Sequence, residues 1–306
     1  MTTHQPRETS VEHGRLMRQA TYASVSVATV LIAIKFVAWL ATDSVAMLAT
    51  LVDSMLDAAA SLVNLFAVRQ SLTPADREHR FGHGKAEPLA GLVQSAFISG
   101  SALFLFVEVG RRFAHPKTIE DGGMALVVMG ASIALTLVLV CFQRYVVRKT
   151  ASLAISADKL HYLGDMLANI SVAVALILAT QFGLHLADPI FGAVIAVYIV
   201  WSAWEIIRQS LDQLMDRELP DEERTRIREI ALSHSEVRGV HDLRTRASGR
   251  DKFIQLHIEL ERLATLARAH EVSAAVEAKL REAFPGAEVI IHQDPEGLDE
   301  PRATFR

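Results

Sequence analysis

The chain has 306 residues, 51% of them hydrophobic, and a formal net charge of −4. So large a hydrophobic share favours a membrane protein over a water-soluble one. The negative charge argues against a nucleic-acid partner, because phosphate binding needs concentrated lysine and arginine. The only cysteine, Cys141, lies inside an apolar run, which excludes a disulfide framework and a cysteine-rich zinc module.

The N-terminal segment, residues 1–19, is polar and charged, and we expect a cytoplasmic tail without a removable signal peptide. Six apolar stretches follow, and each reaches the roughly 20 residues that a helix needs to cross a bilayer core. Short separators with turn or charge signals divide them. We therefore predict an α-helical membrane domain over residues 20–208 with six transmembrane helices, near 20–41, 44–68, 89–110, 122–146, 153–182 and 187–207.

Basic residues indicate the orientation of this domain. An even number of spans puts both termini on one side of the membrane, and three groups of basic residues share that side. The positive-inside rule places the cytoplasm there. Arg111, Arg112 and Lys117, on the other side, are exceptions. The three groups are Arg7, Arg15 and Arg18; Arg69, Arg77, Arg80 and Lys85; and Arg144, Arg148 and Lys149.

After Arg208 the composition becomes charged, and residues 209–295 are predicted to form a second, water-soluble domain. Its pattern predicts three strands and two helices, which make a small α+β sandwich. Residues 296–306 are polar, and we expect a disordered tail. The predicted elements are a helix over 221–234, strands over 239–246 and 252–260, a helix over 263–284 and a strand over 287–292.

Two of the predicted membrane helices carry acidic side chains at helical spacing. Asp53 and Asp57 lie one turn apart on the second helix, and His161 and Asp165 have the same i, i+4 spacing on the fifth. An ionised carboxylate at bilayer depth costs about 2.5–3.5 kcal/mol, so such groups normally face the bundle interior and a partner. Three carboxylates and one imidazole suit a divalent metal ion, and zinc best, because it favours four nitrogen and oxygen ligands.

Simpler interpretations exist for each of these residues alone. A single buried aspartate can hydrogen-bond to a neighbouring helix, and a single histidine is more often a satisfied core residue than a ligand. Two such pairs on separate spans are harder to explain in this way. Lys35, in the first span, could neutralise them, but we expect its ammonium group to extend toward the outer interface.

Two further groups of residues are candidates for metal binding. Asp76, His79 and His83, between the second and third spans, have metal-like spacing, but ordinary solvated charge is an equally good interpretation of an exposed loop. In the soluble domain the candidates come from separate elements. They could form a cluster on one sheet surface or be scattered surface histidines, and the sequence does not decide between these two interpretations. The candidates are His241, His257, His270, His292 and Asp294.

Several motifs within residues 15–295 together resemble the cation diffusion facilitator family, specifically its bacterial YiiP-like zinc and ferrous-iron efflux members. They are Asp53 with Asp57, Phe81-Gly82-His83-Gly84-Lys85-Ala86-Glu87-Pro88, His161-Tyr162 with Asp165, His241-Asp242-Leu243-Arg244-Thr245-Arg246, and Ile290-Ile291-His292-Gln293-Asp294-Pro295. The resemblance implies a homodimer in which each protomer has six membrane spans and a small cytoplasmic α+β domain of the metallochaperone kind.

The resemblance also implies roles for individual residues. Asp53, Asp57, His161 and Asp165 match the transport site, and the family's manganese exporters differ in this quartet, which makes manganese a poorer candidate. Asp76, His79 and His83 match a loop site. Lys85 and Asp216 match an ion pair between protomers. The cytoplasmic binuclear site, in which zinc is expected as a structural ion, is matched by His241, His257, His270, His292 and Asp294.

The predicted function is a proton-coupled antiporter that exports Zn²⁺, or else Fe²⁺ or Cd²⁺, from the cytoplasm by alternating access. His161 is the expected proton-coupling residue, because imidazole titrates near neutrality and a ligand must be deprotonated to bind metal. The resemblance implies the bacterial inner membrane, with both termini cytoplasmic. A membrane-bound metal sensor or binding protein without flux is the alternative. We do not expect an enzyme, because an intramembrane metalloprotease needs a general base and an open metal position.

Overall fold

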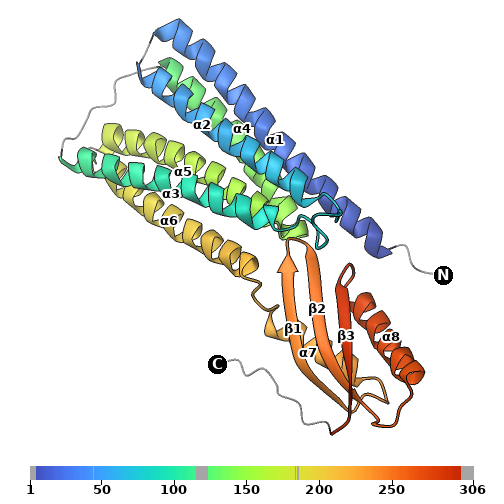
Figure 1. The fold of residues 1–306 in the computed structure, drawn as a ribbon. Coiled ribbons are helices and arrows are strands. Elements are labelled where there is room, and N and C mark those ends of the chain that lie inside the picture. The colour runs from blue at the N-terminus through green and yellow to red at the C-terminus, as the bar shows by residue number, and fades with distance from the viewer. Residues whose placement is uncertain (1–4, 44, 115–122, 183, 185, 298–306) are drawn as a thin grey trace. The chain divides into compact units, whose positions relative to one another are not determined.

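The computed structural model of the chain describes residues 5–43, 45–114, 123–182, 184 and 186–297. It contains two compact units, one over Glu12–Leu211 and one over Asp212–Arg306 together with Met1–Val11. The first unit consists of helices, and the second contains a three-stranded sheet (Figure 1).

Six long helices make up the first unit, and each coincides with one of the predicted apolar stretches. Several extend past the predicted ends. The first begins at Gln5, so most of the expected N-terminal tail is helical. The helices are α1 (Gln5–Thr42), α2 (Val45–Ser71), α3 (Ala86–Ala114), α4 (Gly123–Thr150), α5 (Leu153–Phe182) and α6 (Ala187–Leu214).

Five of these helices, namely α1, α2, α3, α4 and α6, are long and apolar enough to cross a membrane within the residues that the structure describes. The remaining helix, α5, is 30 residues long but carries Asp158, Lys159 and Asp165 in its first half. This helix therefore also has the length of a membrane span, and its charged residues need partners inside the bundle.

The first unit is apolar outside and partly polar inside. Phe104 and Trp201 are 69% and 67% exposed, whereas Gln94, Gln143 and Asp158 have no exposed surface. This distribution suits a lipid surrounding, in which large apolar side chains face the acyl chains and polar groups must find partners inside the bundle.

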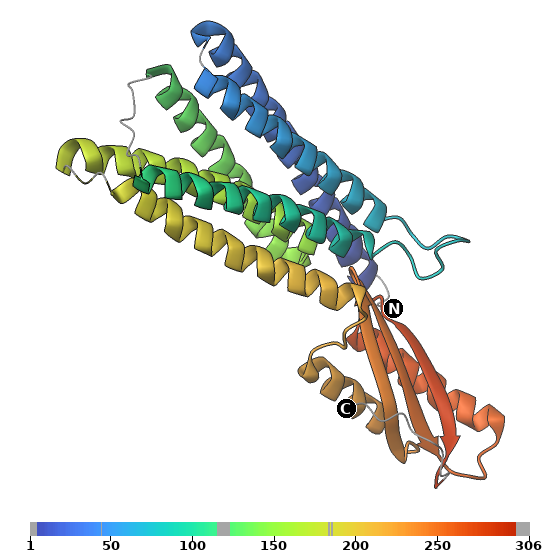
Figure 2. The same ribbon diagram turned by 60° about the vertical axis from the view of Figure 1, so that its left-hand side comes forward.

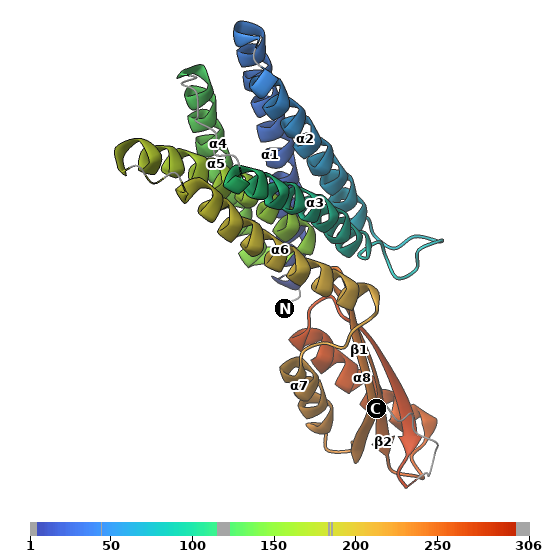
Figure 3. The same ribbon diagram turned by 90° about the vertical axis from the view of Figure 1, so that its left-hand side faces the viewer.

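The position of α5 decides where its charged residues lie. This helix packs against α2, α3 and α4. Figures 2 and 3 show α1 and α2 side by side, and α3, α5 and α6 side by side. Because α5 has neighbours on several sides, one face of the helix is directed into the bundle, and its residues can meet side chains from α2.

The second unit is the predicted arrangement of three strands and two helices, which is thereby confirmed. The sheet order is β1-β2-β3, with β1 antiparallel and β3 parallel to β2. Both helices contribute to the core, where Ile227, Val276 and Leu280 pack with Ile254 and Ile258 of the middle strand. The elements are α7 (Asp221–Leu232), β1 (Gly239–Ser248), β2 (Asp251–Leu260), α8 (Leu266–Ala283) and β3 (Glu288–Pro295).

Several element ends differ from the prediction by a few residues, and two of these differences have clear local reasons. The second helix of this unit, α8, begins at Leu266 and not at residue 263, because the Thr265 side chain accepts a hydrogen bond from the Arg268 backbone N–H and caps the helix. The strand β3 continues to Pro295 and not to residue 292, because its pairing with β2 persists to Leu260. This extension places Asp294 on the sheet.

Candidate metal centres

The transport-site prediction concerns four residues on two helices, and the structure brings three of them together. The His161 Nε2 atom lies 2.9 Å from Asp57 Oδ1 and 3.6 Å from Asp165 Oδ2. One ligand atom from each of the three residues lies within 4.8 Å of the others. His161 is only 7% exposed, and the buried Asp165 Oδ2 has no hydrogen-bond partner among the described residues. Two acids and an imidazole that converge in this way can hold a divalent cation.

Asp53, the fourth predicted ligand, lies one turn before Asp57 on α2. It is exposed and does not belong to the group of ligand atoms within 4.8 Å of one another in the described chain. Its place in the metal site therefore stays a prediction.

Lys35 of α1 hydrogen-bonds to the neighbouring helix α2. Its Nζ atom donates hydrogen bonds to the Thr50 carbonyl oxygen (3.1 Å) and to Ser54 Oγ (2.6 Å) on α2. The ammonium group therefore points across to α2, where Thr50 and Ser54 lie on either side of Asp53 in the sequence. The expected extension toward the outer interface stays a prediction, and both hydrogen-bond acceptors of Lys35 lie on α2.

The loop between α2 and α3 also brings its predicted ligands together. Asp76 Oδ1 lies 3.4 Å from His79 Nδ1, and Asp76 Oδ2 lies 3.4 Å from His83 Nε2. The backbone N–H of His79, and then that of Glu78, donate hydrogen bonds to Asp76 Oδ1 and lower the pKa of this exposed carboxyl. The turn keeps Asp76 ionised and directed at both imidazoles, so the loop can offer three ligands to one cation.

Strand register assembles the candidate ligands of the second unit. His241, His257 and His292 occupy one row across the three strands, since His257 pairs with His241 on one side and with His292 on the other. Asp294 is 7% exposed and contacts all three imidazoles. Its Oδ2 lies 2.8 Å from His257 Nδ1 and 3.3 Å from His241 Nε2, and its Oδ1 lies 3.2 Å from His292 Nε2.

A β-bulge contributes to this geometry. The pairing of β1 with β2 shifts between His241 and Arg244, and Asp242 has a positive φ of 44°. Asp242 Oδ2 lies 3.4 Å from His241 Nδ1, and Glu259 Oε1 lies 3.6 Å from His241 Nε2. Sequence analysis did not select these two carboxylates. Asp242 directly follows His241, and Glu259 lies two residues after His257 on a predicted strand. These positions were the available signal in the sequence.

The remaining predicted residues lie apart from this cluster. His270 is exposed on α8 and does not join the groups of ligand atoms found in the described chain. Asp216 pairs within its own unit with Arg246, whose Nη1 lies 3.2 Å away. The predicted ion pair between Lys85 and Asp216 of different protomers stays a prediction, because one chain does not test it.

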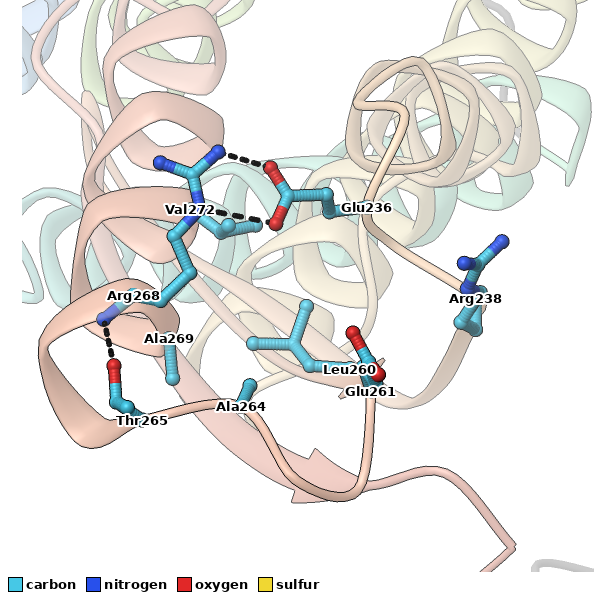
Figure 4. A pocket seen from close by; sticks show the side chains of 9 residues that line it. All are labelled: Glu236, Arg238, Leu260, Glu261, Ala264, Thr265, Arg268, Ala269 and Val272. Carbon is cyan, nitrogen blue, oxygen red and sulfur yellow. Dashed lines mark hydrogen bonds and ion pairs between the residues drawn. The ribbon is translucent and has the colours of Figure 1, made fainter.

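A pocket of about 260 Å³ in the second unit has a different character (Figure 4). Arg268 makes a two-pronged ion pair with both carboxylate oxygens of Glu236 across it, and these hydrogen bonds lower the pKa of Glu236. The two charged groups therefore satisfy each other and join α8 to the segment before β1. None of the residues that line this pocket belongs to the three candidate metal groups of the described residues.

Two protein families match the chain, one over most of the helical unit and one over most of the second unit. The family described as "Cation efflux transmembrane domain" matches residues 21–215. The family described as "Cation efflux protein, cytoplasmic domain" matches residues 219–296. The second unit is accordingly a cytoplasmic domain of this kind.

Relatives of similar length support the same assignment. The "Cation-efflux pump FieF" of Serratia proteamaculans (strain 568) is 49% identical over 284 residues, which cover 93% of this chain and 94% of that protein. The protein of the same name from Cronobacter sakazakii is 50% identical over 284 residues, with the same coverage of 93% and 94%.

Solved structures similar to this chain correspond to its smaller unit. The zinc form of CzrB, described as a candidate zinc transporter, is 34% identical and covers 28% of this chain and 99% of its own, with a TM-score of 0.27. A nickel form of the MamM CTD is 28% identical and covers 25% of this chain and 99% of its own, with a TM-score of 0.24.

The two family matches together span most of the chain, and full-length relatives are about half identical to it. The resemblance predicted from the motifs is thus confirmed, and the relatives are named for the export of cations. The chain belongs to the cation efflux family and is a membrane transporter of metal cations.

Proposed function

We propose that this transporter exports divalent transition metal ions from the cytoplasm in exchange for protons, with Zn²⁺ as the first candidate and Fe²⁺ or Cd²⁺ as alternatives. The observation that carries the proposal is the convergence of Asp57 from α2 with His161 and Asp165 from α5. Asp53 is the proposed fourth ligand. Three carboxylates and one imidazole would give a tetrahedral site of the kind that zinc favours.

The proposed mechanism is alternating access, in which one site opens first to the cytoplasm and then to the opposite side. The site is formed by residues of two different helices, so a relative movement of α2 and α5 changes its geometry. The described arrangement holds three of the four residues together. We propose that the arrival of a metal ion draws Asp53 into the site.

Proton coupling follows from competition at His161. Its Nε2 atom already contacts both Asp57 and Asp165, so a proton on this nitrogen is well placed between two acceptors. The metal ion needs the same nitrogen in its deprotonated form. We propose that metal binding displaces a proton from His161 and that protonation on the other side releases the metal.

The proposed architecture assigns α5 as the sixth membrane span, with membrane helices over residues 20–208 and a cytoplasmic domain over 209–295. Both termini then lie in the cytoplasm, and the membrane is the bacterial inner membrane. We propose that the chain acts as a homodimer, in which Lys85 and Asp216 pair between protomers. Charged groups clustered on a sheet surface support an association that bound metal strengthens.

The two other metal groups are proposed to assist transport. The group on the cytoplasmic sheet, centred on Asp294, would hold zinc as a structural ion, with His270 as a further ligand contributed outside the described cluster. The loop group of Asp76, His79 and His83 would modulate the supply of metal, because an exposed loop cannot itself alternate its access between two sides of a membrane.

Reconstitution into liposomes tests the proposal and separates it from the alternative of a metal sensor without flux. Purified protein in liposomes with a zinc dye inside should carry Zn²⁺ across the membrane, and Asp57→Asn should abolish this flux. Ser132→Ala, a change inside α4 away from the site, is a matched control. Zinc binding without flux in the wild type would favour the sensor.

A further inference from the structure

A second buried polar cluster lies within the helical unit, apart from the metal ligands. We name it the five-helix hub, because every helix from α1 to α5 contributes a side chain to it. All its members are at most 1% exposed. They are Ser24 (α1), Ser61 (α2), Gln94 (α3), Gln143 (α4), and Asp158 and Tyr162 (α5).

Asp158 is the centre of the hub. Its Oδ2 atom lies 2.5 Å from Ser24 Oγ and accepts a hydrogen bond of 2.7 Å from Gln143 Nε2. Its Oδ1 atom accepts a longer hydrogen bond of 3.4 Å from Gln94 Nε2. Tyr162, one turn later, completes the hub through contacts of its hydroxyl oxygen with Ser61 Oγ (2.8 Å) and the Ser24 carbonyl oxygen (3.3 Å).

This carboxyl group has no ion-pair partner in the described part of the chain. Among the described residues no Lys, Arg or His nitrogen lies within 4.0 Å of Asp158, and the groups that α1, α3 and α4 direct at it are neutral. Asn64 of α2 is neutral too, and the titratable groups near Asp158 are His161 and Tyr162 of its own helix. An ionised Asp158 would therefore be a buried charge without a neighbouring cation among the described residues, and burying such a charge is costly in a protein interior.

Ser24 has too few hydrogens for its close contacts if the Asp158 carboxyl group is ionised. A serine hydroxyl has one hydrogen to donate. Ser24 Oγ lies 3.0 Å from the Ala20 carbonyl oxygen and 2.5 Å from Asp158 Oδ2, and it accepts a hydrogen bond from Gln143 Nε2. Both oxygen neighbours need a hydrogen between them and Ser24 Oγ, so one hydrogen is missing if Asp158 is ionised.

We propose that Asp158 is a proton-binding site separate from the metal site. Its carboxylic acid donates a hydrogen bond to Ser24 Oγ, while the Ser24 hydroxyl donates to the Ala20 carbonyl oxygen, and every short contact is then satisfied. The bound proton closes the hub and ties α5, ahead of His161 and Asp165, to the other four helices. This site does not depend on metal exchange at His161, and bound zinc leaves its proton in place.

Infrared spectroscopy of the full-length protein tests the proposal directly. Zinc-saturated wild type, with ¹³C in its aspartate carboxyl groups, should show at about pH 7 an isotope-shifted carbonyl band of a protonated carboxylic acid. Carboxyl groups that bind zinc are deprotonated, so the metal ligands do not contribute to this band. The band should vanish in Asp158→Asn, shift in frequency in Ser24→Ala, and persist in Asp221→Asn, whose side chain is 92% exposed. Absence of the band from zinc-saturated wild type would overturn the proposal, whether or not any variant folds.

Thermal unfolding gives an independent measurement. An asparagine in place of Asp158 would keep the shape of the side chain but cannot ionise, so Asp158→Asn should gain midpoint temperature relative to wild type as the pH rises from about 4 to about 8. The reason is that wild type loses the stability contributed by its bound proton as the pH rises. A difference between the two proteins that does not change over this range would contradict a proton at Asp158.

Discussion

His161 contacts two carboxylates from different helices through a single nitrogen. Nε2 lies 2.9 Å from Asp57 Oδ1 and 3.6 Å from Asp165 Oδ2. Since Asp57 and Asp165 carry no donor when ionised, a proton on Nε2 is what makes these contacts favourable. The nitrogen that would ligate the metal is therefore the one that would hold the proton in the proposed exchange. In the proposed mechanism, the metal ion and the proton compete for this one atom.

The first prediction concerns this nitrogen. His161→Ala removes one ligand and leaves the carboxylates close together, so zinc affinity at the membrane site should fall at least about tenfold, or ~1.4 kcal/mol. Isothermal titration of the detergent-purified protein measures this change, with His13→Ala as the control. An unchanged affinity would remove His161 from the site.

The second prediction concerns the loop. His79→Ala combined with His83→Ala should change the apparent affinity or rate of zinc transport in liposomes and leave measurable flux. The reason is that these residues lie in an exposed loop and are separate in sequence from the ligands on α2 and α5. Complete loss of flux in a correctly folded double variant would show that the loop is part of the transport path.

Sequence spacing could predict much of this chemistry but not all of it. Helical periodicity puts His161 and Asp165 on one face, and the cost of buried charge indicates a partner. Spacing within one helix says nothing about which side chain of α2 faces α5, and in the structure Asp57 joins the group and Asp53 does not. The five-helix hub was missed for the same reason, although Asp158 lies three residues before His161 and so on the same side of α5.

At the scale of elements, the cytoplasmic sheet brings its histidines together through register alone. His241, His257 and His292 are far apart in sequence but share one row of the sheet. Asp294 lies two residues after His292 on β3, on the same face because side chains alternate along a strand. One carboxyl group can therefore contact three imidazoles.

The third prediction tests Asp294 as the common partner. Asp294→Asn should weaken zinc binding by the cytoplasmic cluster at least about tenfold, or ~1.4 kcal/mol, because the buried carboxylate is lost. Equilibrium dialysis of the full-length protein, with the membrane site inactivated by Asp57→Asn in every sample, measures this. Asp251→Asn at the start of β2 is the matched control. The rate of subunit exchange measures how fast the proposed dimer dissociates, and this rate should rise in Asp294→Asn. An unchanged rate would contradict a stabilising role of the bound metal.

The strands were predictable because β-branched and apolar residues alternate with polar ones between turn residues. The bulge at Asp242 was not, because it inserts one residue into β1 without a proline or glycine to mark it. An aspartate tolerates the left-handed conformation better than most residues, which is the one local signal at this position.

At the scale of the whole molecule, function depends on polar groups inside a bundle that is apolar outside. Five of the described helices have the length and composition of membrane spans, and α5, which is as long and as apolar as they are, carries the proposed transport residues His161 and Asp165 and the hub centre Asp158. A hydropathy pattern therefore predicts the helical scaffold but does not show which polar groups inside it are functional. The family assignment rests on the two family matches and on the full-length relatives, and the motifs that predicted it lie on α2, α5, the loop before α3 and the cytoplasmic sheet.

The fourth prediction is tested by following zinc and protons together in one experiment. Purified protein is placed in liposomes that contain a pH dye and a zinc dye, and zinc is added outside under a set pH gradient. We predict that zinc entry is accompanied by proton exit, that both stop in Asp57→Asn and in Asp165→Asn, and that both continue in the control Glu108→Gln. Zinc entry without opposing proton movement, or undiminished zinc entry in the two site variants, would contradict the account.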